Sequence, residues 1–122
     1  MLTPFEIAQK AVQALDSKKA GDITVLKTEK VTSLADYFII ATASSSTHGK
    51  TLVEETEKAL SQAGEPPLRR EGYRSESWVL LDFGCVVVHV FLEETRKFYN
   101  LERLWSDATE IDYTTMIEGE NK

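Results

Sequence analysis

The sequence predicts an α/β or α+β domain in which helices pack on a mixed β-sheet. Short apolar runs rich in Val, Ile and aromatic residues alternate with segments of helical periodicity, and this alternation favours that fold class. The expected order is helix, strand, strand, helix, strand, strand, helix. At 122 residues with 42% hydrophobic content, the chain is long enough to bury one core without disulfide or metal staples.

The first helix is marked by a capping box. Thr3 is the expected N-cap, Pro4 suits the first helical position, and Glu6 lies three residues after Thr3. The apolar positions that then recur at helical spacing are Ala8, Ala11, Val12 and Leu15.

Two strands and a second helix follow. Residues 23–26 and 37–43 are apolar runs of strand length, and residues 47–63 show helical spacing up to Gly64 and two prolines. The expected buried face of this helix consists of Leu52, Thr56, Ala59, Leu60 and Ala63. Residues 68–77 are charged and predict a loop, with an edge strand as the alternative.

A hairpin and a third helix close the predicted domain. Residues 78–81 and 85–92 read as strands joined by Asp82-Phe83-Gly84, a turn signal that ends in Gly. Glu93 and Glu94 then open a helical segment, because acids in a first turn favour a helix start. The expected apolar positions of that segment are Phe98, Leu101, Leu104 and Trp105.

The end of the chain is acidic. Residues 107–122 hold five acids against one lysine, and apolar residues become sparse. We therefore expect a domain over residues 1–105 and an extended or partly disordered acidic tail over residues 106–122.

Composition excludes several classes of protein. The net charge is −6 and no basic stripe is present, which disfavours direct binding to nucleic acid. Cys85 is the only cysteine, so neither an intramolecular disulfide nor a cysteine-based zinc site is possible, and a buried, inert thiol is expected. No secretory signal or membrane-spanning run is present. These features predict a soluble, cytoplasmic protein without cofactor or metal.

Local motifs suggest enzymes but lack the necessary partners. Gly49-Lys50-Thr51 resembles the end of a P-loop, yet Ser44 stands where the first Gly is needed. The simpler interpretation is a helix start with Lys50 facing solvent. The triplet Asp82-Phe83-Gly84 also occurs in kinases, but the chain is too short to hold the other kinase segments.

Neither histidine predicts a catalytic or metal site. His48 opens a helix, where it could cap the helix or contact a partner. His89 lies between valines in a predicted strand, where a hydrogen-bonded core histidine is the favoured interpretation. Ser44, His89 and Asp82 could be assembled into a triad, but no nucleophile-elbow sequence supports one.

Four segments together resemble a known family. SLADYFIIATASSSTH, WVLLDFG, VVVHVF and EETRKFYNLERLW occur in the order typical of the ribosomal silencing factor family, RsfS or Iojap, from about residue 23 to residue 105. The resemblance implies a protein that docks on the L-fourteen protein of the large ribosomal subunit and blocks joining of the small subunit. It also implies a nucleotidyltransferase-like fold. The Gly-Ser loop and carboxylate pair of those enzymes are missing here, so we expect no catalysis. The family usually has an acid or amide where Cys85 stands.

The expected docking surface is the hairpin region that the resemblance indicates. An acid beside an aromatic on a tight turn is typical of an interface hot spot with an orienting charge. The predicted contacts are Trp78, Leu81, Asp82, Phe83 and Tyr99. Strand alternation puts Trp78 and Leu80 on one face and Val79 and Leu81 on the other, so either helices cover both faces or one face meets a partner.

Three alternatives stay open at the level of sequence. The chain could be an adaptor in large-subunit assembly that uses the same surface, or a nucleotidyltransferase-like enzyme. The free chain could also form a homodimer, because an exposed apolar face seeks cover.

Overall fold

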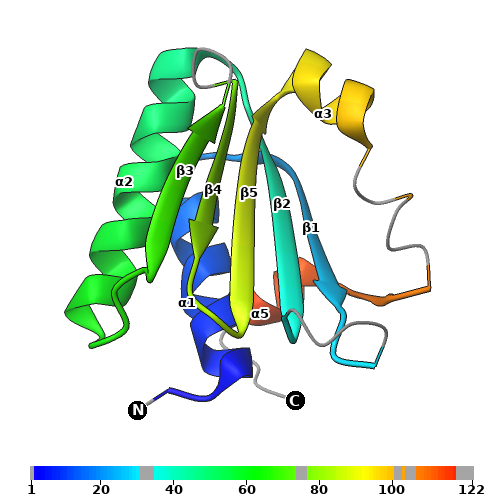
Figure 1. Ribbon diagram of the computed structural model, residues 1–122. Helices are drawn as coiled ribbons and strands as arrows, with labels where there is room; N and C mark the ends of the chain where they lie inside the picture. The colour runs from blue at the N-terminus through cyan, green and yellow to red at the C-terminus, as the bar shows by residue number, and fades with distance from the viewer. Residues whose placement is uncertain (1, 31–34, 74–76, 101–102, 104–106, 118–122) are drawn as a thin grey trace.

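The computed structural model describes residues 2–30, 35–73, 77–100, 103 and 107–117 (Figure 1). Its elements, in chain order, are α1 (Pro4–Ser17), β1 (Gly21–Lys27), β2 (Tyr37–Ala43), α2 (Ser46–Gln62), β3 (Arg69–Tyr73), β4 (Trp78–Asp82), β5 (Val86–Leu92), α3 (Glu93–Tyr99), β6 (Thr109–Ile111) and α5 (Tyr113–Ile117). All seven predicted elements are present, and β3, β6 and α5 are additional.

The strands form one mixed sheet in the order β3-β4-β5-β2-β1-β6, which confirms the predicted fold class. The central pair, β2 and β5, is parallel, and every other neighbouring pair is antiparallel. A parallel pair needs a long crossover connection. Here α2, β3 and β4 supply it, and α2 leads the chain behind the sheet (Figure 1).

Helices α1 and α2 cover one face of the sheet (Figure 1). The predicted apolar positions of α1 are all buried there, and Leu52, Thr56 and Leu60 of α2 are buried beside them. Ala59 and Ala63 are only half-buried, while Val53 joins the core. The main core therefore lies between these two helices and the strands.

The starts of both helices follow local rules. The capping box of α1 is complete, because Thr3 accepts from the Glu6 amide while the Glu6 carboxylate accepts from the Thr3 amide. Ser45 is the N-cap of α2, and its hydroxyl accepts from the His48 amide at 3.1 Å. Lys50 is exposed, as predicted.

The predicted hairpin is β4 and β5 with the turn Phe83-Gly84-Cys85 between them. The Phe83 amide donates to the Val86 carbonyl at 2.9 Å, and Gly84 has φ +90°, a value that favours glycine. Cys85 lies in this turn and is half-buried, whereas a buried strand residue was expected. Burial still raises the pKa of its thiol, so little of it is thiolate at neutral pH.

The charged segment after the prolines contains an edge strand. Strand β3 pairs only with β4 among the described strands, which settles the alternative between loop and strand. Arg70 of β3 bonds Glu57 of α2 at 3.4 Å on the helix side of the sheet.

The acidic end of the chain is folded in part, which corrects the expected tail. Strand β6 pairs with β1, and the Met116 side chain of α5 is fully buried in the main core. Gln9 and Gln13 of α1 both donate to the Met116 carbonyl, at 3.2 and 3.1 Å. Residues 109–117 therefore belong to the domain. Residues 106 and 118–122 lie outside the described residues.

Helix α3 is shorter than the predicted helical segment. It ends at Tyr99, and its C-cap residue Asn100 has a left-handed φ of 49°. Phe98, an expected apolar position of the segment, is 81% exposed. Leu101, Leu104 and Trp105 lie outside the described residues. Within the part of the chain that is described, no helix is both long and apolar enough to cross a membrane.

Candidate functional site

The sheet has a second face, turned toward the viewer in Figure 1, that we call the front face. Strand register assigns to it Arg69, Glu71, Trp78, Leu80, Asp82, Val87, His89, Phe91, Phe38 and Ile40. Helices α1 and α2 lie behind the sheet, and α3 lies at the upper end of its strands. Among the described helices, none lies along the front face.

Four rings pack together at the centre of the front face. Trp78 stacks on Phe91 with ring centroids 5.0 Å apart and 26° between the planes. His89 lies 6.0 Å from both of these rings and 5.4 Å from Phe38. We call these four residues the aromatic stack. Its Phe38 and Phe91 belong to a second apolar cluster, separate from the main core, and Trp78 packs against that cluster.

A groove of about 450 Å³ adjoins the aromatic stack. Its lining is Phe38, Leu68, Arg69, Leu80, Asp82, Gly84, Val87 and His89. Leu68 is 73% exposed at its rim. The groove thus combines apolar and charged side chains on a face that no described helix covers, which makes it the candidate contact surface.

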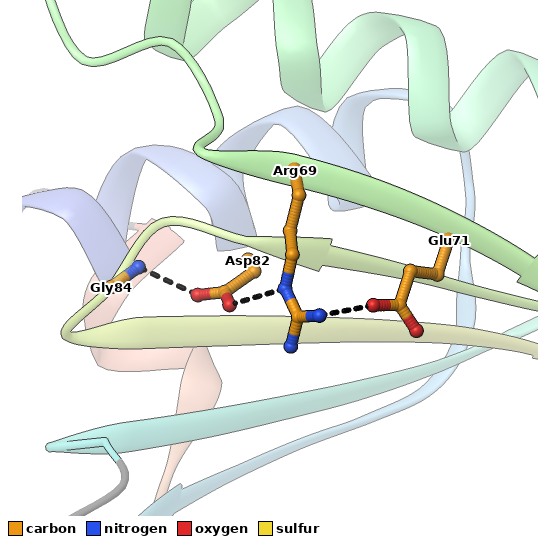
Figure 2. A network of polar contacts seen from close by, with 4 residues as sticks. All are labelled: Arg69, Glu71, Asp82 and Gly84. Atoms are coloured by element: carbon orange, nitrogen blue, oxygen red, sulfur yellow. Dashed lines mark hydrogen bonds and ion pairs between the residues drawn. The ribbon is translucent and has the colours of Figure 1, made fainter.

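Asp82 organises one end of this groove (Figure 2). One carboxylate oxygen accepts from the Gly84 amide at 2.8 Å, and the other accepts from Arg69 Nε at 3.0 Å. Arg69 also pairs with Glu71. Asp82 thus closes the hairpin turn and links it to the edge strand, and its carboxylate stays partly exposed.

The structure divides the five predicted contact residues. Trp78 and Asp82 lie on the front face and are partly exposed. Leu81 is 0% exposed and Phe83 is 8% exposed, and both side chains lie in the main core. Tyr99 is the last residue of α3, and its side chain is not among the parts of the chain that the structure describes.

Several front-face residues were not predicted as contacts. The alternation rule already paired Leu80 with Trp78, and the same period of two in β5 puts Val87, His89 and Phe91 on one side. Leu68 and Arg69 gave no signal, because they lie in a segment that could have been a loop. Their place follows from the pairing of β3 with β4.

The two histidines have different surroundings. His48 joins three segments, since its Nδ1 accepts from the Ser44 amide at 2.9 Å and its Nε2 bonds the Lys18 carbonyl at 2.8 Å. It therefore fixes the start of α2 against the end of α1. His89 is buried, as predicted, but only its Nδ1 has a hydrogen-bond partner among the described residues.

A second hollow, of about 610 Å³, lies where α3 meets β1 and β2. Arg96 of α3 reaches across it and donates to the Asp22 carbonyl and to the hydroxyls of Thr42 and Thr24, at 2.6, 2.7 and 2.9 Å. These bonds hold α3 on the sheet, which is a structural role. Within the described residues, no three His, Cys, Asp or Glu side chains gather to hold a metal ion.

Comparison with known proteins gives a consistent result. Residues 2–122 match the family model described as "Ribosomal silencing factor during starvation". A protein of Halalkalibacterium halodurans named "Ribosomal silencing factor RsfS" is 38% identical over 112 residues, which cover 92% of this chain and 96% of that protein. The mouse "Mitochondrial assembly of ribosomal large subunit protein 1" is 32% identical over 89% of this chain and 49% of that protein.

The fold is also that of a solved structure. A crystal structure of a protein from Chromobacterium violaceum superimposes with a TM-score of 0.83 at 40% identity, covering 86% of this chain and 88% of that one. The chain belongs to the ribosomal silencing factor (RsfS) family.

Proposed function

We propose that this chain is a translation repressor that binds the large ribosomal subunit at its L-fourteen protein and sterically blocks joining of the small subunit. The observation that carries the proposal is the family match over residues 2–122. The name of the bacterial relative supports it. The proposed activity is binding alone, with no catalytic step.

The front face is the proposed docking surface. Trp78 supplies a partly exposed aromatic ring, Leu68 an exposed apolar side chain and Asp82 a partly exposed acid. Trp is enriched among residues that dominate binding energy, and an acid can orient a basic partner. Leu81 and Phe83 support this surface indirectly, because their side chains lie in the main core and hold the hairpin in place. Tyr99 remains a predicted contact at the end of α3.

Net charge favours a basic partner. The chain carries −6 overall, so a basic ribosomal protein is attracted while naked RNA is repelled. The chain therefore contacts the ribosome through a ribosomal protein and makes no sequence-specific contact with nucleic acid.

Sedimentation with purified ribosomal subunits tests the docking surface. The parent chain should sediment with the large subunit and not with the small one. Trp78→Ala and Asp82→Lys should each weaken binding by about thirtyfold, the effect of losing a hot-spot residue. Glu54→Lys is the matched control for Asp82→Lys, because it makes the same charge change on the exposed side of α2, behind the sheet.

Folding must be checked for each variant, because Asp82 also accepts from the Gly84 amide. Leu68→Ser provides a variant without this complication, since Leu68 is mostly exposed. Full binding by folded Trp78→Ala, Asp82→Lys and Leu68→Ser would place docking elsewhere on the molecule.

A second candidate function is an adaptor in assembly of the large subunit, which the name of the mouse relative favours. A subunit-joining assay separates the two functions. A repressor added to mature, purified subunits lowers the yield of joined ribosomes and of translated product. An adaptor that acts only in assembly leaves both unchanged.

A homodimer of the free chain, the alternative left open by the sequence, would compete with docking if it used the front face. Sedimentation of the chain alone at several concentrations measures whether a dimer forms. A dimer that the front-face variants abolish would place its contact on the docking surface.

A further inference from the structure

Trp78 and His89 form a hydrogen-bonded pair within the aromatic stack. The Trp78 indole Nε1 donates to His89 Nδ1 at 3.1 Å. The two residues lie on neighbouring strands, where Phe91 is the direct partner of Trp78. The indole is therefore fixed from two directions, by stacking on Phe91 and by the bond to His89.

This bond sets the position of the imidazole proton. Because Nδ1 accepts from the indole, the neutral ring must carry its proton on Nε2. That nitrogen is buried and has no hydrogen-bond partner among the described residues. His89 is 4% exposed, so the unpaired donor is held away from solvent.

A buried donor without an acceptor lowers stability, and an apolar ring of similar size would avoid that cost. A phenyl ring at this position would keep the contacts with Phe38 and Phe91. It would lack only the acceptor for Trp78. The feature of His89 that a phenylalanine cannot replace is therefore the lone pair that receives the indole N–H.

We propose that His89 is a positioning residue for docking: its Nδ1 holds the Trp78 indole in the orientation that the partner protein meets. This inference rests on the proposed function, because Trp78 is there assigned to the docking surface. His89 itself is buried, so this role requires no direct contact with the partner. It acts by reducing the rotamer freedom that Trp78 would otherwise lose on binding.

Two substitutions separate the acceptor from the ring. His89→Phe keeps an aromatic ring and removes the acceptor. His89→Asn removes the ring and keeps an oxygen close to the place of Nδ1. If His89 serves only as packing, the phenylalanine variant should dock as well as the parent and the asparagine variant should dock worse, following their stability.

The positioning role predicts the opposite order for docking. His89→Phe should be at least as stable as the parent chain and should bind the large subunit about tenfold more weakly. His89→Asn should be less stable and should keep its affinity within about threefold. In Trp78→Phe, which has no indole N–H, adding His89→Phe should cause no further loss, because the two residues act through one bond.

A readout that needs no ribosome tests the bond itself. The chain has two tryptophans, Trp78 and Trp105, and the Trp78→Phe variant assigns their indole N–H signals in a ¹⁵N-labelled sample. Exchange of the Trp78 indole proton with solvent should be slow in the parent and in His89→Asn. It should be about tenfold faster or more in His89→Phe.

The outcomes are distinguishable. If the parent chain does not sediment with the large subunit, the proposed function is wrong, whatever the exchange rates are. If the parent and His89→Phe bind equally while both are folded, docking stands and the positioning role of His89 is wrong. Equal exchange rates in the parent and His89→Phe would also overturn it.

Discussion

His89 shows how one side chain makes stability depend on pH. Burial lowers its pKa from 6.5 to about 4, because the charged ring would lose its hydration. Between these two values the unfolded chain binds a proton that the folded chain does not. The free energy of unfolding therefore falls as the pH falls through this window, and the contribution is complete only above pH 6.5.

We predict that this loss amounts to about 3 kcal/mol between pH 7 and pH 4. His89→Phe removes the titrating group. Between pH 7 and pH 4 the free energy of unfolding of this variant should therefore fall by about 3 kcal/mol less than that of the parent. Denaturant unfolding of both chains at several pH values measures the difference. Parallel pH profiles for the two chains would contradict the lowered pKa.

The residue type of Phe83 suggested a docking contact, whereas its position in the fold gives it a role in the core. Its aromatic ring beside Asp82 resembled a docking anchor, but the ring lies in the main core. Phe83→Ala should therefore lower the free energy of unfolding by about 3 kcal/mol, as large-to-small core substitutions do. Phe83→Leu, the control that removes less volume, should cost less than Phe83→Ala. A folded Phe83→Ala variant of unchanged stability that fails to bind the large subunit would restore the ring to the docking surface.

At the scale of elements, the sequence predicted those that local chemistry determines. The capping box of α1 consists of Thr3 and Glu6, and Pro4 suits the first helical position, so neighbouring residues specify the helix start. The run that became β2 is apolar on both faces, and its predicted bounds agree with the structure. In both cases the signal lies within the element.

The elements that the sequence missed depend on distant residues. Strand β6 has three residues and is stable only because β1 pairs with it. Helix α5 has five residues, and hydrogen bonds from Gln9 and Gln13 fix it on α1. Short acidic segments have no periodicity that would reveal such partners.

Met116 provides the test of this packing. Met116→Ala should lower the free energy of unfolding by about 3 kcal/mol, because it leaves a cavity in the main core. Met116→Leu preserves most of the volume and should cost less than about 1.5 kcal/mol. Thermal unfolding of both variants beside the parent measures the difference. Equal stability of the alanine variant and the parent would mean that α5 does not contribute to the fold in solution.

For the molecule as a whole, the sequence predicted which residues share a face of the sheet but not which face the helices cover. Alternation along β4 correctly separated Trp78 and Leu80 from Val79 and Leu81. Periodicity could not tell which set the helices cover, because both sets are apolar. That choice depends on the direction of the crossover through α2, which is a property of the complete chain.

Charge acts at the same scale and gives the last prediction. A chain of net charge −6 that meets a basic protein should associate quickly at low salt, because long-range attraction steers the encounter. Raising the salt from about 0.05 M to about 0.3 M should slow association with the large subunit by about tenfold and change dissociation much less, since buried apolar contacts are screened little. Stopped-flow mixing of labelled chain with large subunits measures both rates. Glu54→Lys, which makes the net charge less negative without changing the front face, should associate more slowly than the parent and dissociate at the parent rate. If salt changes only the dissociation rate and leaves the association rate constant, ion pairs inside the contact, and not the apolar front face, hold the complex together.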